Sequence, residues 1–185
     1  MNTSPPLRDH VAVLILERAA TLLAQNGPTA SMAEIAQAAG VGRATLYRHF
    51  PTRDALLEAL AAAAVEDLGE RLAEAGLETV PVREAVARAC RAFVTTGGKY
   101  LALMRTGHKP ADPAAADRHI AAPLRALLQR GVDEGELRPD IAPELMLALF
   151  SALIETGLTL AAQIGAEQAA AAVSGLFLDG AGARA

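Results

Sequence analysis

Cationic and hydrogen-bonding side chains are concentrated in one short stretch of this 185-residue chain. From Gly40 to Arg53 the sequence has three arginines and no carboxylate, although the formal net charge of the whole chain is −4. A local positive face on an acidic protein is typical of phosphate binding, because each neutralised phosphate releases condensed counterions. Arginine and hydroxyl groups also hydrogen-bond base edges and backbone oxygens. The chemistry that this stretch indicates is the binding of double-stranded DNA.

Two short helices are expected to present these side chains. Ser31 and Glu34 have the spacing of a capping box, which marks the start of the first helix. Gly40 supplies its end, since glycine adopts the left-handed conformation that is favoured there. In the second helix, roughly residues 42–50, Leu46 and Phe50 lie on one face and point inward. Two helices joined by a turn that contains glycine are typical of the helix-turn-helix motif.

Each polar side chain of this motif receives a role as a hypothesis. Arg43 lies in the first turn of the second helix, where its planar fork can grip guanine O6 and N7. Thr45 offers a hydroxyl to phosphate or a methyl to thymine, while Tyr47 and His49 are assigned to phosphates. Arg53 adds a cation at the edge of the groove. The full set of predicted DNA-binding residues is Thr29, Ser31, Arg43, Ala44, Thr45, Tyr47, Arg48, His49 and Arg53.

The stretch G-V-G-R-A-T-L-Y-R-H-F-P-T-R-D-A-L-L resembles the signature of the TetR family of transcriptional repressors. The resemblance covers roughly the first sixty residues, and it includes the pairs Ile35-Ala36 and Gly40-Val41. It departs at Gly42, where the family usually has a Ser or Thr cap, and at Arg53, where Lys is common. Gly is tolerated as a helix N-cap at a cost of a few tenths of a kcal/mol.

This resemblance implies an all-α fold in two domains. Residues 1–52 are expected to form a three-helix DNA-binding domain, and residues 53–185 a larger helical domain for ligand binding and dimerisation. The implied function is a sequence-specific DNA-binding regulator, a repressor that leaves its operator when an unknown small-molecule effector binds. The alternative is a ligand-binding or adaptor helical dimer without specific DNA binding.

Apolar spacing along the remaining chain predicts a succession of helices. Their expected ranges are 8–25, 53–75, 82–100, 114–130, 143–162 and 166–178. Thr52 is expected to cap the second of these, and Pro123 is expected to kink or break the fourth. The first is expected to pack across the two reading helices and support them.

The helix expected at 143–162 has apolar residues on two faces, which predicts burial on two faces. Met146, Phe150, Ile154 and Leu158 form one stripe, assigned to the protein's own core. The other stripe is assigned to a homodimer, because paired heads place two recognition helices about 34–36 Å apart. A monomer whose core uses both faces is the alternative. The predicted dimerisation residues are Leu145, Leu149, Leu153, Leu160, Val173 and Leu176.

The effector site is expected in the C-terminal domain, since ligand pockets are mostly apolar with a few polar groups. Arg88, Arg91 and Arg105 would select an anionic compound, although a solvated helix face explains them equally well. The absence of Trp favours an aliphatic compound over a large planar one. Packing within the core is the plainer interpretation of every apolar candidate. The candidates are Phe93, Tyr100, Met104, His108, Phe150, Ile154 and Glu155.

Several other classes of protein find no support in the sequence. Cys90 is the single cysteine, so no disulfide within the chain is possible, which suits a reducing cytoplasm. A buried inert thiol is expected there, with a redox sensor as the alternative. No nucleophile elbow, phosphate loop, metal-ligand spacing or paired acids are found, which predicts neither enzyme nor cofactor nor metal. No signal peptide and no membrane span of about 20 residues are expected.

Overall fold

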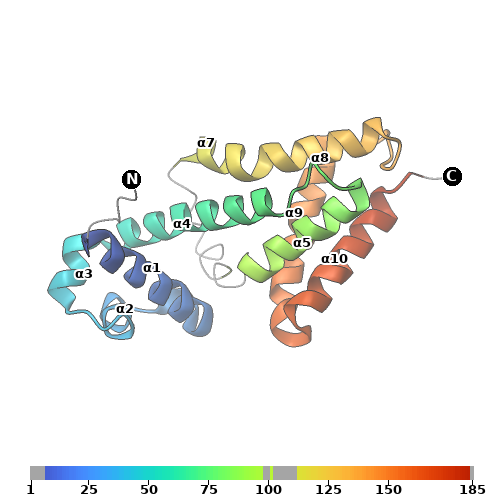
Figure 1. Cartoon of the computed structure of the whole chain (residues 1–185). Coiled ribbons are helices and arrows are strands. Elements are labelled where there is room, and N and C mark those ends of the chain that lie inside the picture. Colours follow the sequence, from blue (N-terminus) through green and yellow to red (C-terminus); the bar gives the residue numbers. More distant parts are fainter. Residues whose placement is uncertain (1–6, 98–100, 102–111, 184–185) are drawn as a thin grey trace. The chain divides into compact units, whose positions relative to one another are not determined.

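The computed structural model describes residues 7–97, 101 and 112–183, and every regular element in these ranges is helical (Figure 1). The all-α fold is thereby confirmed. Five of the predicted helices recur with ends displaced by at most three residues. The elements are α1 (Leu7–Asn26), the 3₁₀ turn η1 (Gly27–Thr29), α2 (Met32–Ala38), α3 (Arg43–His49), α4 (Arg53–Glu74), α5 (Val82–Gly97), α7 (Pro113–Ala116), the π turn η3 (Asp117–Ala121), α8 (Ala122–Asp133), α9 (Pro143–Ile164) and α10 (Ala166–Ala181).

The chain divides into two compact units, and the division falls inside α4, after Ala64. The first unit therefore extends beyond the boundary expected at residue 52. The reason is that the first part of α4 is buried against α1, α2 and α3: Leu56 and Leu60 have at most 1% of their surface exposed. Thr52 caps this helix as predicted, because its hydroxyl accepts a hydrogen bond from the Ala55 amide at 3.0 Å.

The second unit is built around α9, which packs against α5, α8 and α10. Its core contains three phenylalanines in edge-to-face contact. The ring centroids of Phe93 and Phe150 lie 6.0 Å apart, and those of Phe150 and Phe177 lie 5.1 Å apart. This geometry brings the positive edge of one ring to the negative face of the next and is stabilising beyond the area buried.

A π turn precedes Pro123, where a kink or break was expected. Proline has no amide hydrogen, and its ring clashes with the carbonyl four residues earlier in a regular α-helix. Widening of the backbone at η3 relieves this clash, as π bulges do. Arg125 and Asp117 form an ion pair of 2.7 Å across the turn. The regular α-helix is thus interrupted by a π turn just before Pro123, where a kink or break was predicted.

Arg130 of α8 holds the loop after α4 within the second unit. Its guanidinium donates hydrogen bonds to the carbonyls of Leu77, Glu78 and Val80, at 2.9–3.0 Å. These carbonyls belong to a loop that has no helical ladder to satisfy them, so the side chain takes the place of secondary structure.

No membrane span was expected, because the longest uncharged stretch of the sequence is short and interrupted. Helix α9 has 22 residues, and by length and composition it meets the criteria for a membrane span. A helix that packs one face into its own protein meets the same criteria, so this is weak evidence. One face of α9 is indeed buried, with Met146, Phe150, Ile154 and Leu158 all at most 4% exposed. The predicted inward stripe is confirmed.

A close approach of α9 and α10 predicts a sensitive position at Gly157. A Cβ atom placed there would lie 2.6 Å from Cγ2 of Val173, whose side chain is stiff because it is branched at Cβ. We expect Gly157→Ala to lower the free energy of unfolding by about 1–3 kcal/mol through overpacking, measured by urea titration. This loss should outweigh the better helix propensity of Ala, about 1 kcal/mol.

A double-mutant cycle provides the control. Val173→Ala removes the opposing methyl groups, so in that background Gly157→Ala should cost less or become stabilising. An equal cost in both backgrounds would contradict the steric explanation.

Candidate nucleic-acid interface

The first helix of the predicted motif begins with the expected capping box. The Ser31 hydroxyl accepts a hydrogen bond from the Glu34 amide at 3.3 Å. In return, the Glu34 carboxylate accepts bonds of 2.7 Å from both the Ser31 amide and the Ser31 hydroxyl. Because these bonds favour the charged carboxylate, the pKa of Glu34 lies below its ordinary value, the backbone bond being the larger cause.

The turn between the two helices depends on Gly40. Its φ angle is +65°, in the left-handed region that side chains with a Cβ seldom adopt. The Gly40 amide donates to the Gln37 carbonyl and the Val41 amide to the Ala36 carbonyl, both at 3.0 Å. These bonds cap the end of α2 and set the direction in which α3 starts.

The second helix, α3, is anchored by two apolar side chains. Leu46 has no exposed surface and Phe50 is 6% exposed, and both belong to a cluster that includes Ile15 and Ile35. Gly42 stands at the N-cap in extended conformation without a side-chain cap. Helix α1 contributes Ile15 and Ala19 to this cluster, which confirms its supporting role.

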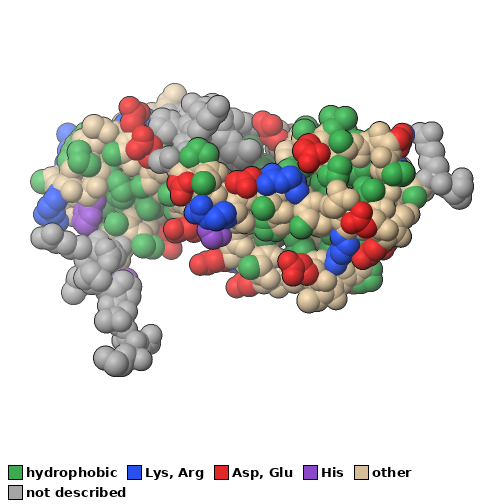
Figure 2. Space-filling view, turned by 90° about the horizontal axis from the view of Figure 1, so that it is seen from above, with side chains coloured by type: hydrophobic (Ala, Val, Ile, Leu, Met, Phe, Trp, Pro, Cys, Tyr) green, Lys and Arg blue, Asp and Glu red, His purple; other side chains and the backbone are tan. Residues whose placement is uncertain are grey.

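The outward side of α3 carries the cationic residues. Arg43, Ala44, Tyr47 and Arg48 are exposed, and we call these four residues the reading face. Thr45 and His49 are half-buried at its borders, and the His49 ring lies 6.3 Å from that of Phe50. In the space-filling view, basic and histidine side chains lie close together on the first unit, at the left (Figure 2). The predicted surface is therefore assembled on one side of one helix.

Three of the predicted DNA contacts are already engaged within the protein. The Thr29 hydroxyl donates to the Asn26 carbonyl at 3.4 Å, and the Ser31 hydroxyl belongs to the capping box. Arg53 is half-buried, and Nη1 of its guanidinium donates to the Ala30 carbonyl. The bond between Arg53 and Ala30 joins positions 23 residues apart. The spacing of residues within the motif could not predict it.

Two of the predicted effector residues are buried in the core and do not line an open pocket. Phe150 and Ile154 are 3% and 4% exposed, and the space beside Phe150 admits no water molecule. Both are core residues in the part of the chain that the structure describes. Phe93 is half-buried against Phe150, and Glu155 is exposed. Tyr100, Met104, Arg105 and His108 lie outside the described residues, so their assignment stays a prediction.

A groove that the sequence did not indicate lies in the second unit, between α4 and η3. Its volume is about 460 Å³, and its walls include Leu72, Leu77, Arg118, His119 and Pro123. His119 approaches Gly69 so closely that a Cβ there would lie 2.8 Å from Cβ of the histidine. Such contacts join positions about 50 residues apart and leave no local pattern.

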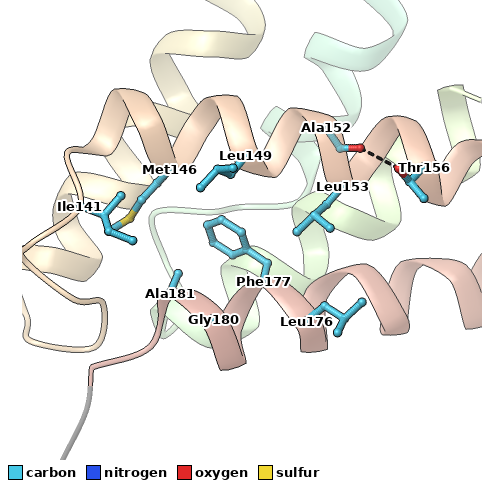
Figure 3. A pocket seen from close by; sticks show the side chains of 10 residues that line it. All are labelled: Ile141, Met146, Leu149, Ala152, Leu153, Thr156, Leu176, Phe177, Gly180 and Ala181. Carbon is cyan, nitrogen blue, oxygen red and sulfur yellow. Dashed lines mark hydrogen bonds between the residues drawn. The ribbon is translucent and has the colours of Figure 1, made fainter.

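An uncharged groove of about 370 Å³ runs between α9 and α10 (Figure 3). Leu149 and Leu153 of α9 and Leu176 and Phe177 of α10 point into it from opposite walls. Leu145, Leu149, Leu160 and Leu176 are 40–66% exposed, and we call these four residues the α9–α10 face. Ile164, 40% exposed on the same helix, was missed.

Val173 does not belong to the α9–α10 face, which corrects its predicted role in dimerisation. Its side chain is 5% exposed and faces Gly157 of its own chain. Leu153 is half-buried. The sequence could not separate Val173 from Leu176, because an Ala-rich helix is apolar on every side and its orientation depends on its neighbours.

The described ranges contain neither a metal site nor a reactive thiol. They contain no group of three or more His, Cys, Asp or Glu that could hold a metal ion. Cys90 is fully buried, as expected, and burial raises the pKa of its thiol to about 12. A thiol with this pKa stays protonated and unreactive at neutral pH.

Comparison with known proteins gives consistent relatives. Residues 15–60 match the family model described as bacterial regulatory proteins, tetR family. The chain is 34% identical over 166 residues to the HTH-type transcriptional repressor LfrR of Mycolicibacterium smegmatis, spanning 84% of this chain and 83% of that protein.

Two solved structures extend the similarity to the fold. The TetR-like regulator LfrR from Mycobacterium smegmatis, in complex with proflavine, has a TM-score of 0.72 and 28% identity, covering 92% of this chain and 96% of that one. The TetR-family regulator PfmR from Thermus thermophilus has a TM-score of 0.71 and 26% identity, covering 89% and 97%.

The capping box predicts a defined pH dependence. Because the folded-state pKa of Glu34 is lowered, its carboxylate stabilises the fold above the ordinary value of 4.5, and this contribution is lost as the pH falls through the folded-state pKa. Ser31→Ala removes the hydroxyl bond and keeps the larger backbone bond. We expect the pKa of Glu34, followed by NMR of its carboxyl carbon, to rise part of the way to its ordinary value.

Glu34→Gln is the matched control, since it should abolish this part of the pH dependence of unfolding. An unchanged Glu34 titration in Ser31→Ala would show that the hydroxyl does not stabilise the carboxylate.

Proposed function

This chain belongs to the TetR family of bacterial regulatory proteins, and on that premise we propose that it is a repressor that a small-molecule ligand releases from operator DNA. Members of this family are DNA-binding regulators of transcription and not enzymes. The chain is accordingly a DNA-binding transcriptional regulator. We propose that it acts in the cytoplasm, where bacterial DNA lies.

The reading face is the observation that carries the proposal. Leu46 and Phe50 hold α3 from below, so Arg43 and Tyr47 are presented from a fixed support. We assign α3 to the major groove, with Arg43 on a guanine edge and Tyr47 and Arg48 on phosphates. An adaptor that had lost DNA binding would have no need of exposed arginines on a capped and anchored helix.

The α9–α10 face supports a homodimer as the DNA-binding form. Its four leucines are among the most exposed large apolar residues in the described ranges, and the groove beside them is uncharged. Contiguous exposed apolar surface of this kind marks an interface. A two-fold axis through α9 and α10 pairs each face with its own copy.

The proposed ligand response is supported by two observations. LfrR, to which the chain is similar, has been solved in complex with proflavine. Helix α4 contributes residues to both compact units of this chain, so a change in the second unit can reach the reading helices along one continuous element.

Selection of duplexes from a randomised library tests the DNA-binding proposal. The chain should enrich one sequence with two-fold symmetry, whose half-sites lie about one helical turn apart. Arg43→Ala should relax the preference at one position in each half-site, at a cost of about 1–3 kcal/mol. Arg48→Gln should weaken binding to all duplex sequences by the same factor. Enrichment of no sequence would refute specific DNA binding.

Charge placed on the α9–α10 face tests the homodimer. Leu149→Glu combined with Leu176→Glu should shift the chain from dimer to monomer in sedimentation analysis, because four carboxylates would be buried unpaired at the interface. Val13→Glu is the control, since Val13 of α1 is 54% exposed and lies outside this face. A dimer that persists in the double variant, or a monomeric parent, would contradict the proposal.

A further inference from the structure

Arg53 occupies a position that electrostatics alone does not favour. It is the first residue of α4, where the helix dipole is positive and a cation is unfavourable. Asp54 next to it has the sign that this position prefers. Some other interaction of Arg53 must therefore offset this cost.

The structure provides such an interaction in the Ala30 carbonyl, to which Nη1 of Arg53 donates a hydrogen bond. Ala30 is 2% exposed and packs with Leu23, Leu57 and Leu60. A charge-assisted bond to a carbonyl at such a buried position is stronger than one between neutral groups. It joins the start of α4 to the segment that leads into α2.

The residues after Ala30 determine the direction of the reading helices. Ser31, the next residue, caps α2, and the bonds of Gly40 and Val41 tie α3 to the end of α2. The other end of the bond is held as well, because Thr52 caps the first turn of α4. Arg53 thus closes a ring of contacts that runs from α2 through α3 to α4.

We propose that Arg53 is a positioning residue, which fixes the entry to α2 through the Ala30 carbonyl and so sets the angle of α3, rather than a phosphate contact at the groove edge. This inference rests on the proposed function, since it concerns how DNA is bound. It differs from the role that the sequence alone suggested for the same side chain.

The dependence of DNA affinity on salt separates the two roles. A phosphate contact contributes about 0.9 to the slope of log affinity against log salt concentration, because it releases counterions. A bond within the protein contributes nothing to this slope. The probe is the duplex that the parent chain enriches from the randomised library. Arg48→Gln provides the reference, because it should remove one phosphate contact from each protomer of the dimer.

We expect Arg53→Gln to weaken binding about tenfold at every salt concentration, the effect of losing a charge-assisted hydrogen bond, with the parent's slope. A slope reduced by about two, as expected for Arg48→Gln when both protomers of the dimer each lose one phosphate contact, would overturn the proposal. Unchanged affinity would overturn it as well.

Replacement of Arg53 by citrulline distinguishes positioning from a general loss of folding. Citrulline has nearly the shape of arginine and keeps N–H donors but carries no charge. It should restore the affinity to within about threefold of the parent, since a neutral bond to Ala30 survives and is roughly half as strong as a charge-assisted one. If citrulline is as weak as Arg53→Gln and lowers the slope, Arg53 acts on phosphate.

Hydrogen exchange of the amides from Ser31 to Ala39 in the free, full-length chain provides a readout without DNA. Exchange should be fastest in Arg53→Gln and closer to the parent's rate with citrulline, and equal rates in all three proteins would overturn the proposal. If the parent binds no duplex at all, the proposed function fails. The hydrogen-exchange measurement still decides whether Arg53 fixes α2.

Discussion

The burial of Leu46 beneath α3 is the contact on which DNA reading by this protein depends. A helix of seven residues is too short to be stable in isolation, so its conformation must come from packing and from the turns around it. Leu46 and Phe50 provide the packing, and the Gly40 turn and the capping box of α2 provide the ends. Every outward side chain of α3 takes its direction from these few contacts.

Packing between helices also determines the structure of the second unit. Helix α9 places one apolar stripe against α5, α8 and α10, and leaves another exposed on the α9–α10 face. Surface ion pairs such as Arg91 with Glu167, at 2.9 Å and more than half exposed, contribute little to stability. Packing therefore holds this unit together, and close approaches such as that of Gly157 to Val173 leave little room for change.

Sequence alone determined the features that depend on neighbours in the chain. The capping box at Ser31, the left-handed turn at Gly40 and the interruption of the α-helix before Pro123 each follow from a few consecutive residues. The two stripes of α9 follow from helical periodicity. The reading face could be predicted for the same reason, because residues 43–49 form one helix, and Leu46 and the C-cap residue Phe50 mark its inward side.

Only the tertiary structure determined the features that depend on contacts between distant segments of the chain. It placed Val173 in the core and left Leu176 exposed, engaged Arg53 with the Ala30 carbonyl, and extended the first unit to Ala64. In each case the partner lies at least a dozen residues away. Periodicity shows which residues are apolar or charged, but the identity of the surface that meets each of them is set by packing between elements.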